Sequence, residues 1–325
     1  MNAPTAQAPA QDCLVSRYRD VRAWTETLAA PLGEADLTVQ SMDDASPGKW
    51  HLAHTTWFFE QFLLKPLVPG YRGFCDDYPY LFNSYYEAVG PRHPRPRRGL
   101  LTRPPLADIL AYRRAVDEAM VRLLEPGLAP PARALAELGL HHEQQHQELF
   151  LTDLLHLFAQ NPLRPAYHPA AAQPLPTEAG TASPTWQEFD GGLVEIGHAG
   201  NGFAFDCEGP RHQVYLRPYA LASRPVTNRE WLDFMADGGY RTPGHWLSDG
   251  WARVQAENWD SPLYWEEDDG TWRQMGLRGL EPLDLEAPVC QVSYFEADAF
   301  ARWAGKRLPT EFEWEHAAAD IPVAG

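Results

Sequence analysis

The sequence is poor in cysteine, in positive charge and in long apolar segments, and each shortage excludes a class of protein. The 325 residues include only four cysteines, and no two of them form the close pair that zinc fingers and zinc ribbons need. Scattered cysteines in a chain of this size indicate reduced thiols rather than a disulfide framework, so we expect a cytoplasmic protein. The four are Cys13, Cys75, Cys207 and Cys290.

The charge balance is strongly acidic, with a formal net charge of −17 at pH 7. Nucleic-acid backbones and anionic membranes repel such a chain, so we expect neither as a partner. No apolar run approaches the roughly 20 residues that cross a bilayer. The Ala- and Pro-rich segment 1–12 lacks the basic start and the apolar centre of a signal peptide, and we predict a disordered tail there.

The first half of the chain has the periodicity of helices. Apolar residues recur at helical spacing over 14–28, 46–64, 105–124 and 132–158. Ser46-Pro47 is a typical N-cap and first-turn pair for the second of these helices. The pattern predicts a four-helix bundle over 13–160. The connection 64–104 is too long and too rich in Pro, Arg and Tyr for a plain linker, so we expect it to be functional.

The composition changes after residue 160. Repeated prolines over 161–185 indicate a semi-rigid linker. Short strand-like segments then alternate with Gly-rich turns, as in 191–197 and 213–216, and two short helices are predicted over 228–237 and 294–304. Tryptophan is frequent in this half. The sequence therefore predicts an irregular α+β domain over 186–325 that is held together by aromatic packing.

A histidine pattern on the fourth helix predicts a metal site. His142 and His146 are four residues apart, so both imidazoles project from one face of the helix. The second helix offers a third imidazole, from His54 or, alternatively, from His51. Three neutral histidines that leave coordination positions open are typical of a catalytic metal rather than a structural one.

Four segments of the chain together resemble one known family: Ser46–His54, Leu81–Glu87, His141–Glu148 and Arg307–Trp314. Their combination is similar to the ergothioneine-biosynthesis sulfoxide synthases, in which a DinB-like four-helix bundle precedes a C-type-lectin-like domain related to formylglycine-generating enzyme. Members of that family continue through a Gly-x-Val-Trp-Glu-Trp-like segment, so the resemblance implies that the second domain is truncated at its C-terminus.

The resemblance implies a chemistry for these residues. It implies a mononuclear non-heme Fe(II) held by His54, His142 and His146. The implied reaction is the O₂-dependent coupling of a thiol sulfur to the imidazole C2 of hercynine, the trimethyl betaine of histidine, which gives a sulfoxide. The thiol is cysteine or γ-glutamylcysteine in different members. The amide of Gln145 would bind the substrate imidazole.

Two groups in the long connection complete the predicted site. By resemblance to members that use free cysteine, Tyr85 and Tyr86 line the pocket, and Tyr85 is the first choice as a proton donor that steers oxygen towards the sulfoxide. Arg95 and Arg98 belong to a basic cluster in an otherwise acidic chain. Guanidinium groups match a carboxylate bidentately, so these two predict a clamp on the substrate carboxylate.

Three other functions are compatible with the sequence. Selenoneine synthases share this architecture and couple hercynine to a selenosugar, although the tyrosines and arginines of the long connection favour sulfur. A DinB-like thiol transferase or hydrolase would hold zinc on the same histidines. A non-enzymatic binding module is the third alternative, because lectin-like folds often only bind ligands.

Overall fold

The computed structural model describes residues 11–168, 183–200 and 202–321, and the chain forms two units. One unit comprises the chain up to Pro169 together with Leu277–Gly279, and the other comprises the remainder. The division falls inside the stretch predicted as a linker. Residues 1–10 of the predicted tail and 169–182 of that linker lie outside the described residues. The predicted tail, 1–12, overlaps the first helix, which begins at Gln11.

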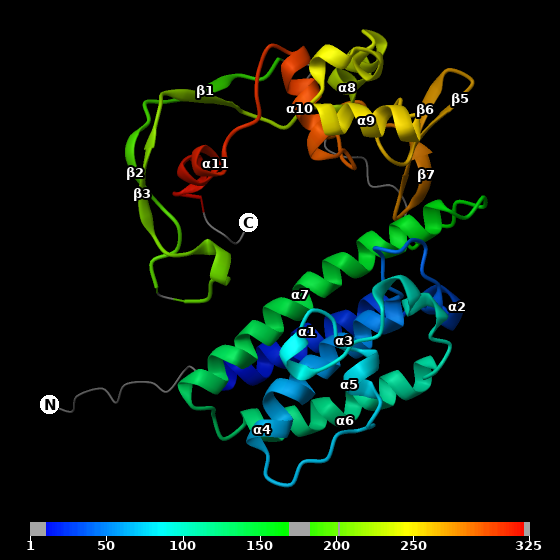
Figure 1. The fold of residues 1–325 in the computed structure, drawn as a ribbon, viewed down its shortest axis with the longest axis vertical. Coiled ribbons are helices and arrows are strands. Elements are labelled where there is room, and N and C mark those ends of the chain that lie inside the picture. The colour runs from blue at the N-terminus through cyan, green and yellow to red at the C-terminus, as the bar shows by residue number, and fades with distance from the viewer. Residues whose placement is uncertain (1–10, 169–182, 201, 322–325) are drawn as a thin grey trace, which may run out of the picture. The chain divides into compact units, whose positions relative to one another are not determined.

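The first unit is a helical bundle, as predicted (Figure 1). Its four long helices are α1 (Gln11–Ala29), α3 (Gly48–Phe59), α6 (Leu106–Leu124) and α7 (Pro130–Ala159). Helix α3 contacts both α6 and α7, and α1 contacts α7. The bundle core is closed by large buried side chains such as Trp57, Phe59 and Tyr112. Their burial removes apolar surface from water, which is the main force that holds the helices together.

Helix α3 begins one residue later than the Ser46-Pro47 pair predicts, because the hydroxyl of Ser46 has another partner. Pro47 occupies the N-cap position of α3 and makes no side-chain cap. The backbone N–H of Ser46 donates to Asp153 Oδ2 at 2.8 Å, and its hydroxyl accepts from Arg98 Nη1 at 2.9 Å. Ser46 therefore connects the start of α3 to α7 and to the long connection through hydrogen bonds. Beyond Phe59, the helical path continues through a π-helical turn (Glu60–Leu64) into α4 (Lys65–Leu67).

The long connection between α4 and α6 has little regular structure. It contains α5 (Tyr78–Leu81) and two 3-10 turns, Glu87–Val89 and Arg95–Leu100. A further short helix, α2 (Glu34–Thr38), precedes α3. None of the helices in the described part of the chain combines the length and the apolar composition that a bilayer span needs.

The second unit is built from small antiparallel sheets and short helices, in agreement with the predicted α+β class. Strand β1 (Trp186–Phe189) pairs with β4 (Tyr219–Ala222), and β2 (Gly192–Ile196) pairs with β3 (His212–Leu216). A three-stranded sheet follows in the order β5 (Trp265–Asp268), β6 (Thr271–Gly276) and β7 (Gly279–Pro282).

Four helices complete this unit: α8 (Asn228–Ala236), α9 (Ser248–Glu257), α10 (Tyr294–Trp303) and α11 (Glu311–Ala318). Three of them start with a capping box, in which Thr227, Ser293 or Thr310 accepts from the backbone N–H of a glutamate three residues later. The predicted aromatic core is present. Its buried members are Trp231, Phe234, Tyr240, Trp246, Val254, Trp265, Ala299 and Phe300.

Candidate metal centre

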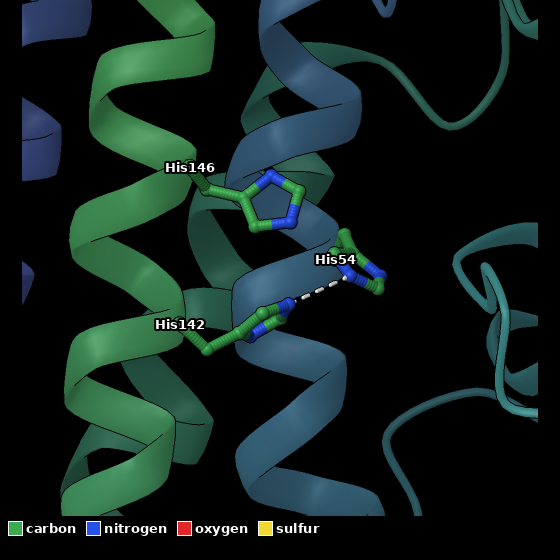
Figure 2. A group of neighbouring side chains, drawn as sticks. All are labelled: His54, His142 and His146. Atoms are coloured by element: carbon green, nitrogen blue, oxygen red, sulfur yellow. Dashed lines mark hydrogen bonds between the residues drawn. The ribbon is translucent and has the colours of Figure 1, made fainter. Parts of the chain in front are cut away.

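Three histidines converge where α3 and α7 lie side by side (Figure 2). His54 comes from α3, and His142 and His146 come from adjacent turns of α7. One ring nitrogen of each lies within 4.8 Å of a ring nitrogen of the other two. This spacing brings three donor atoms close enough for a single ion, since metal–nitrogen bonds are about 2 Å long.

The ring of His54 is fixed on both faces and at one edge. It stacks between Trp50, whose ring centroid is 4.5 Å away, and Trp57, at 5.4 Å. Its Nδ1 lies 2.6 Å from the carbonyl oxygen of Phe82, so Nδ1–H donates there. The other nitrogen, Nε2, is then unprotonated and lies 3.3 Å from His142 Nε2. A backbone acceptor thus sets the tautomer that a metal ligand needs.

His51, the alternative third ligand, does not join this group. Its Nδ1 lies 2.8 Å from Nδ1 of His146, and its Nε2 lies 3.0 Å from Oδ2 of Asp153. Both of its ring nitrogens therefore have protein partners. The geometry places His51 behind His146, and it favours His54 as the third donor.

Burial keeps the three imidazoles neutral. It lowers the pKa of His142 to about 4. Burial and the neighbouring imidazoles hold the pKa values of His54 and His146 well below the usual range. Neutral imidazoles offer lone pairs, and the group contains no carboxylate, so a divalent transition metal fits the donor set.

A cavity of about 290 Å³ opens onto the three histidines. Its lining includes Tyr85, Tyr86, Arg95 and Arg98 as well as the three rings. The structure therefore brings together seven of the eight residues that the sequence singles out. The exception is Gln145, which is exposed on α7 and does not line this cavity.

The two tyrosines differ in their surroundings. Tyr85 is 68 % exposed, and its hydroxyl accepts from Arg95 Nη1 at 2.8 Å. Tyr86 is half-buried, and its ring centroid lies 6.5 Å from that of His54 and 6.4 Å from that of His142. Burial raises the pKa of Tyr86, so its phenol stays protonated at neutral pH. Tyr85, the predicted first choice, is thus the more exposed phenol, and Tyr86 is the one whose ring centroid lies within 6.5 Å of those of His54 and His142.

Arg98 is a buried cation on the cavity wall. Its guanidinium lies 3.4 Å from the ring centroid of Trp50 and donates to the hydroxyls of Ser46 and Ser84. Burial, with Arg95 nearby, lowers the pKa of Arg98 to about 9, so the group is still charged at neutral pH. Within the described residues, the side-chain hydrogen bonds of Arg95 and Arg98 go to hydroxyl groups, and the Nε of each is buried without a hydrogen-bond partner.

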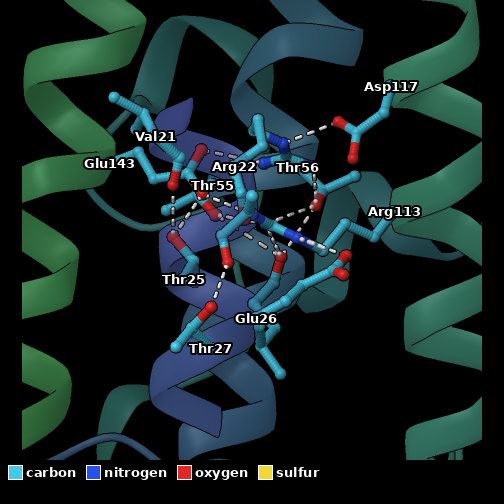
Figure 3. Close-up of polar contacts among 12 residues, drawn as sticks. Val21, Arg22, Thr25, Glu26, Thr27, Thr55, Thr56, Arg113, Asp117 and Glu143 are labelled. Carbon is cyan, nitrogen blue, oxygen red and sulfur yellow. Dashed lines mark hydrogen bonds and ion pairs between the residues drawn. The ribbon is translucent and has the colours of Figure 1, made fainter. Parts of the chain in front are cut away.

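A buried ionic network behind the site fixes α7 (Figure 3). Glu143, the residue after His142, accepts from Arg22 Nη1 at 2.9 Å, Arg113 Nη2 at 2.6 Å and Thr25 Oγ1 at 2.6 Å. Arg22 also donates to Asp117 at 2.6 Å. Helical periodicity alone does not predict this network. One feature of the sequence does indicate it: Arg22 and Arg113 lie on the apolar faces of their helices, where an unpaired charge would be costly.

Comparison with known proteins supports this architecture. Residues 17–150 match the DinB superfamily, and residues 174–325 match the sulfatase-modifying factor enzyme 1-like domain. A formylglycine-generating enzyme of Streptomyces coelicolor is 34 % identical over 161 residues, which cover 46 % of this chain and 51 % of that protein.

Two relatives match across both units. Hercynine oxygenase of Mycolicibacterium smegmatis is 33 % identical over 316 residues, covering 92 % of this chain and 70 % of that protein. Hercynine oxygenase of Mycobacterium tuberculosis is 34 % identical over 296 residues, covering 90 % and 66 %. The chain thus spans about two thirds of the length of these relatives. It belongs to the hercynine oxygenase family of oxygen-dependent oxidoreductases, which confirms the resemblance that its four motifs predict.

Proposed function

We propose that this protein uses Fe(II) and O₂ to couple a thiol to the imidazole C2 of hercynine, forming a sulfoxide. The observation that carries the proposal is the group of three neutral, converging imidazoles at a cavity whose wall also holds Tyr86 and Arg98. The name of the relatives supports hercynine as the substrate and O₂ as the oxidant.

His54, His142 and His146 would hold the iron. Three protein ligands leave up to three positions on an octahedral ion, and a set without a carboxylate accepts an anionic thiolate without an excess of negative charge. When bound, Fe(II) supplies oxygen activation and favours the deprotonated thiol. The protein contributes the rest, by holding both substrates beside the three rings and by delivering protons.

The overall reaction balances with O₂ as the only oxidant. The C2–H bond of the imidazole and the S–H bond of the thiol break, and a C–S bond forms, which releases two electrons and two protons. Oxidation of the sulfur to the sulfoxide releases two more electrons. One oxygen atom ends in the sulfoxide and the other leaves as water, which takes up both protons.

Arg95 and Arg98 would bind the carboxylate of the thiol substrate. A pocket of about 440 Å³ adjoins the histidine cavity, and both arginines line the two spaces together with Ser84 and Tyr85. Among the described residues, the guanidinium of Arg98 donates only to hydroxyl groups, so a substrate carboxylate in this pocket would supply its counter-charge. Cysteine and γ-glutamylcysteine both carry such a group.

Tyr86 would act as the proton donor next to the metal. Its raised pKa keeps the proton on the phenol, and its ring centroid lies within 6.5 Å of those of His54 and His142. A group that donates a proton near the reacting oxygen favours the coupling over simple oxidation of the thiol. Tyr85 is placed instead to hold Arg95 through its hydroxyl.

An assay with defined substrates tests the proposal. Protein reconstituted with Fe(II) without oxygen is exposed to air with hercynine and, in turn, cysteine, γ-glutamylcysteine or a selenosugar, and product masses are measured. We expect a hercynyl sulfoxide with one of the two thiols and oxygen uptake that requires both substrates. A selenium product alone would favour a selenoneine synthase. Uptake that never depends on hercynine would refute the function.

A pair of variants tests the ligand assignment. His142→Ala should lose its equivalent of Fe(II), measured by metal analysis after anaerobic desalting. His156→Ala is the matched control, because this histidine lies on the same helix but outside the group of three, with its Nδ1 at 2.7 Å from the Ser41 hydroxyl. Full iron retention by His142→Ala would remove this residue from the proposed ligand set. Stoichiometric zinc in place of iron would favour a hydrolase or thiol transferase.

A further inference from the structure

A chain of hydrogen bonds leads from His146 to a carboxylate on the same helix. Asp153 lies seven residues after His146, two helical turns on, so both project towards α3. His51 of α3 lies between them, with Nδ1 at 2.8 Å from His146 Nδ1 and Nε2 at 3.0 Å from Asp153 Oδ2. His51 is only 3 % exposed. Asp153 is held in turn by the backbone N–H of Ser46 at 2.8 Å.

The direction of each hydrogen bond follows from the carboxylate. An ionised carboxylate can only accept, so Nε2 of His51 must carry a proton and donate it to Asp153. In a neutral imidazole the other nitrogen then has no proton, and Nδ1 of His51 accepts. The donor to it is therefore Nδ1–H of His146. This leaves Nε2 of His146 unprotonated, which is the form that binds a metal.

We propose that His51 and Asp153 are positioning residues that hold His146 in the Nδ1–H tautomer, so that its Nε2 lone pair is ready for the ion. The carbonyl of Phe82 does the same for His54. His142 differs, because within the described residues its Nδ1 is buried without a hydrogen-bond partner. The inference rests on the proposed ligand role of His146, and it does not depend on the identity of the substrates.

The strength of the effect can be bounded. Hydrogen-bond partners behind a metal-bound histidine typically change metal affinity by about 10- to 100-fold when they are removed. His51→Leu removes the acceptor for His146 and keeps an apolar side chain in the site. His51→Asn is the matched variant, because its amide oxygen occupies a position close to that of Nδ1 and can still accept from His146. We therefore expect ~10- to 100-fold weaker metal binding in the first and a loss of at most ~3-fold in the second.

Two measurements test the proposal. The first uses metal-free protein labelled with ¹⁵N-histidine, in which two-bond proton–nitrogen correlations report the tautomer of each ring, and His146→Gln assigns the His146 signal. We expect the Nδ1–H form in the wild type and in His51→Asn, and a shift towards Nε2–H in His51→Leu. The second is Co(II) affinity by competition with a chelator. Glu148→Gln removes an exposed carboxylate from the same helix and should change neither result.

Each outcome of these measurements either supports or overturns the proposal. An Nε2–H wild-type ring, or an unchanged tautomer and affinity in His51→Leu, would overturn the proposal. If His51→Leu does not fold, Asp153→Asn and Asp153→Ala replace it: the asparagine carbonyl still accepts from His51, so only the alanine variant should lose the tautomer and the affinity. Failure of the proposed function can be distinguished from failure of this proposal. Tautomer and Co(II) affinity can follow the prediction in a protein that makes no sulfoxide, and a sulfoxide-forming enzyme can bind Co(II) equally well in both His51 variants.

Discussion

Replacing Glu143 by alanine should be among the most destabilising single changes in the bundle. Its carboxylate has no solvent exposure and accepts three hydrogen bonds, two of them from buried guanidinium groups. Removing it leaves the charge of Arg113 buried without its shortest partner, and that of Arg22 with Asp117 alone. An unpaired buried charge costs far more than the pair contributes, because the charge has lost both water and counter-ion.

The magnitude follows from two independent estimates. Breaking a buried ion pair on one side typically costs about 3–5 kcal/mol. Burial opposes ionisation of Glu143, but the guanidinium groups of Arg113 and Arg22 overcome it and lower the pKa from 4.5 to about 2. At about 1.4 kcal/mol for each factor of ten, this difference corresponds to ~3 kcal/mol in favour of the folded state at neutral pH. Both estimates exceed the usual ~1 kcal/mol of a point substitution.

Urea unfolding followed by ellipticity at 222 nm measures this loss, because that signal is dominated by the long helices of the bundle. Glu148→Ala is the matched control, since it removes an exposed glutamate from the same helix and should cost less than ~0.5 kcal/mol. A loss below about 1 kcal/mol in Glu143→Ala, equal to that of the control, would show that the two arginines are satisfied without this carboxylate.

The same group gives the pH dependence a definite sign. The pKa of Glu143 is lower in the folded state than in the unfolded chain, so its contribution is complete above about pH 4.5 and declines as the pH falls towards 2. Glu143→Gln cannot titrate there. The difference in unfolding free energy between the wild type and Glu143→Gln should therefore shrink between pH 5 and the lowest pH at which both still fold. A difference that stays constant or grows on acidification would contradict the assignment.

Three other predictions concern the site and its support. Gly139→Ala should destabilise the bundle by ~1–3 kcal/mol in urea, because the added Cβ would lie 2.6 Å from an aromatic ring of α3, and a more stable variant would refute the packing argument. Tyr86→Phe should shift the product from sulfoxide to oxidised thiol by ~100-fold or more in mass spectrometry, whereas Tyr85→Phe should shift it much less. Arg98→Met should raise KM for the thiol by ~10- to 100-fold with little effect on KM for hercynine. Arg97→Met, at an exposed arginine, should change neither value. Equal effects of Arg98→Met on both substrates would exclude the clamp.

The sequence predicts the helices and the donor pair well because both depend on local periodicity. Four residues on a helix return to the same face whatever surrounds it, so the pairing of His142 with His146 follows from the chain alone. The choice between His51 and His54 is different, since the two lie three residues apart and both can face the core. Only tertiary structure separates them, through the carbonyl of Phe82 on one and the carboxylate of Asp153 on the other.

The features that the sequence does not predict all need partners far away along the chain. Glu143 is flanked by histidines and glutamines, and it looks like one more polar residue of an exposed helix turn. It is buried because Arg22 and Arg113, 121 and 30 residues away, converge on it. Ser46 fails as a cap for the same reason, since its hydroxyl accepts from Arg98 and its backbone N–H donates to the partly buried carboxylate of Asp153.

Helix α7 carries two sets of polar residues that constrain each other. Glu143 and Gln147 point into the bundle, where Gln147 donates to the Val21 carbonyl and to Thr25. His142, His146 and Asp153 point towards the cavity, at offsets that keep them on one face. A rotation of the helix by one residue, about 100°, would break the ionic network and the histidine group together. Because the buried ionic contacts of the first set are costly to break, they fix the direction in which His142 and His146 point. Weakening the network should therefore also weaken metal binding, even though none of its members belongs to the proposed ligand group.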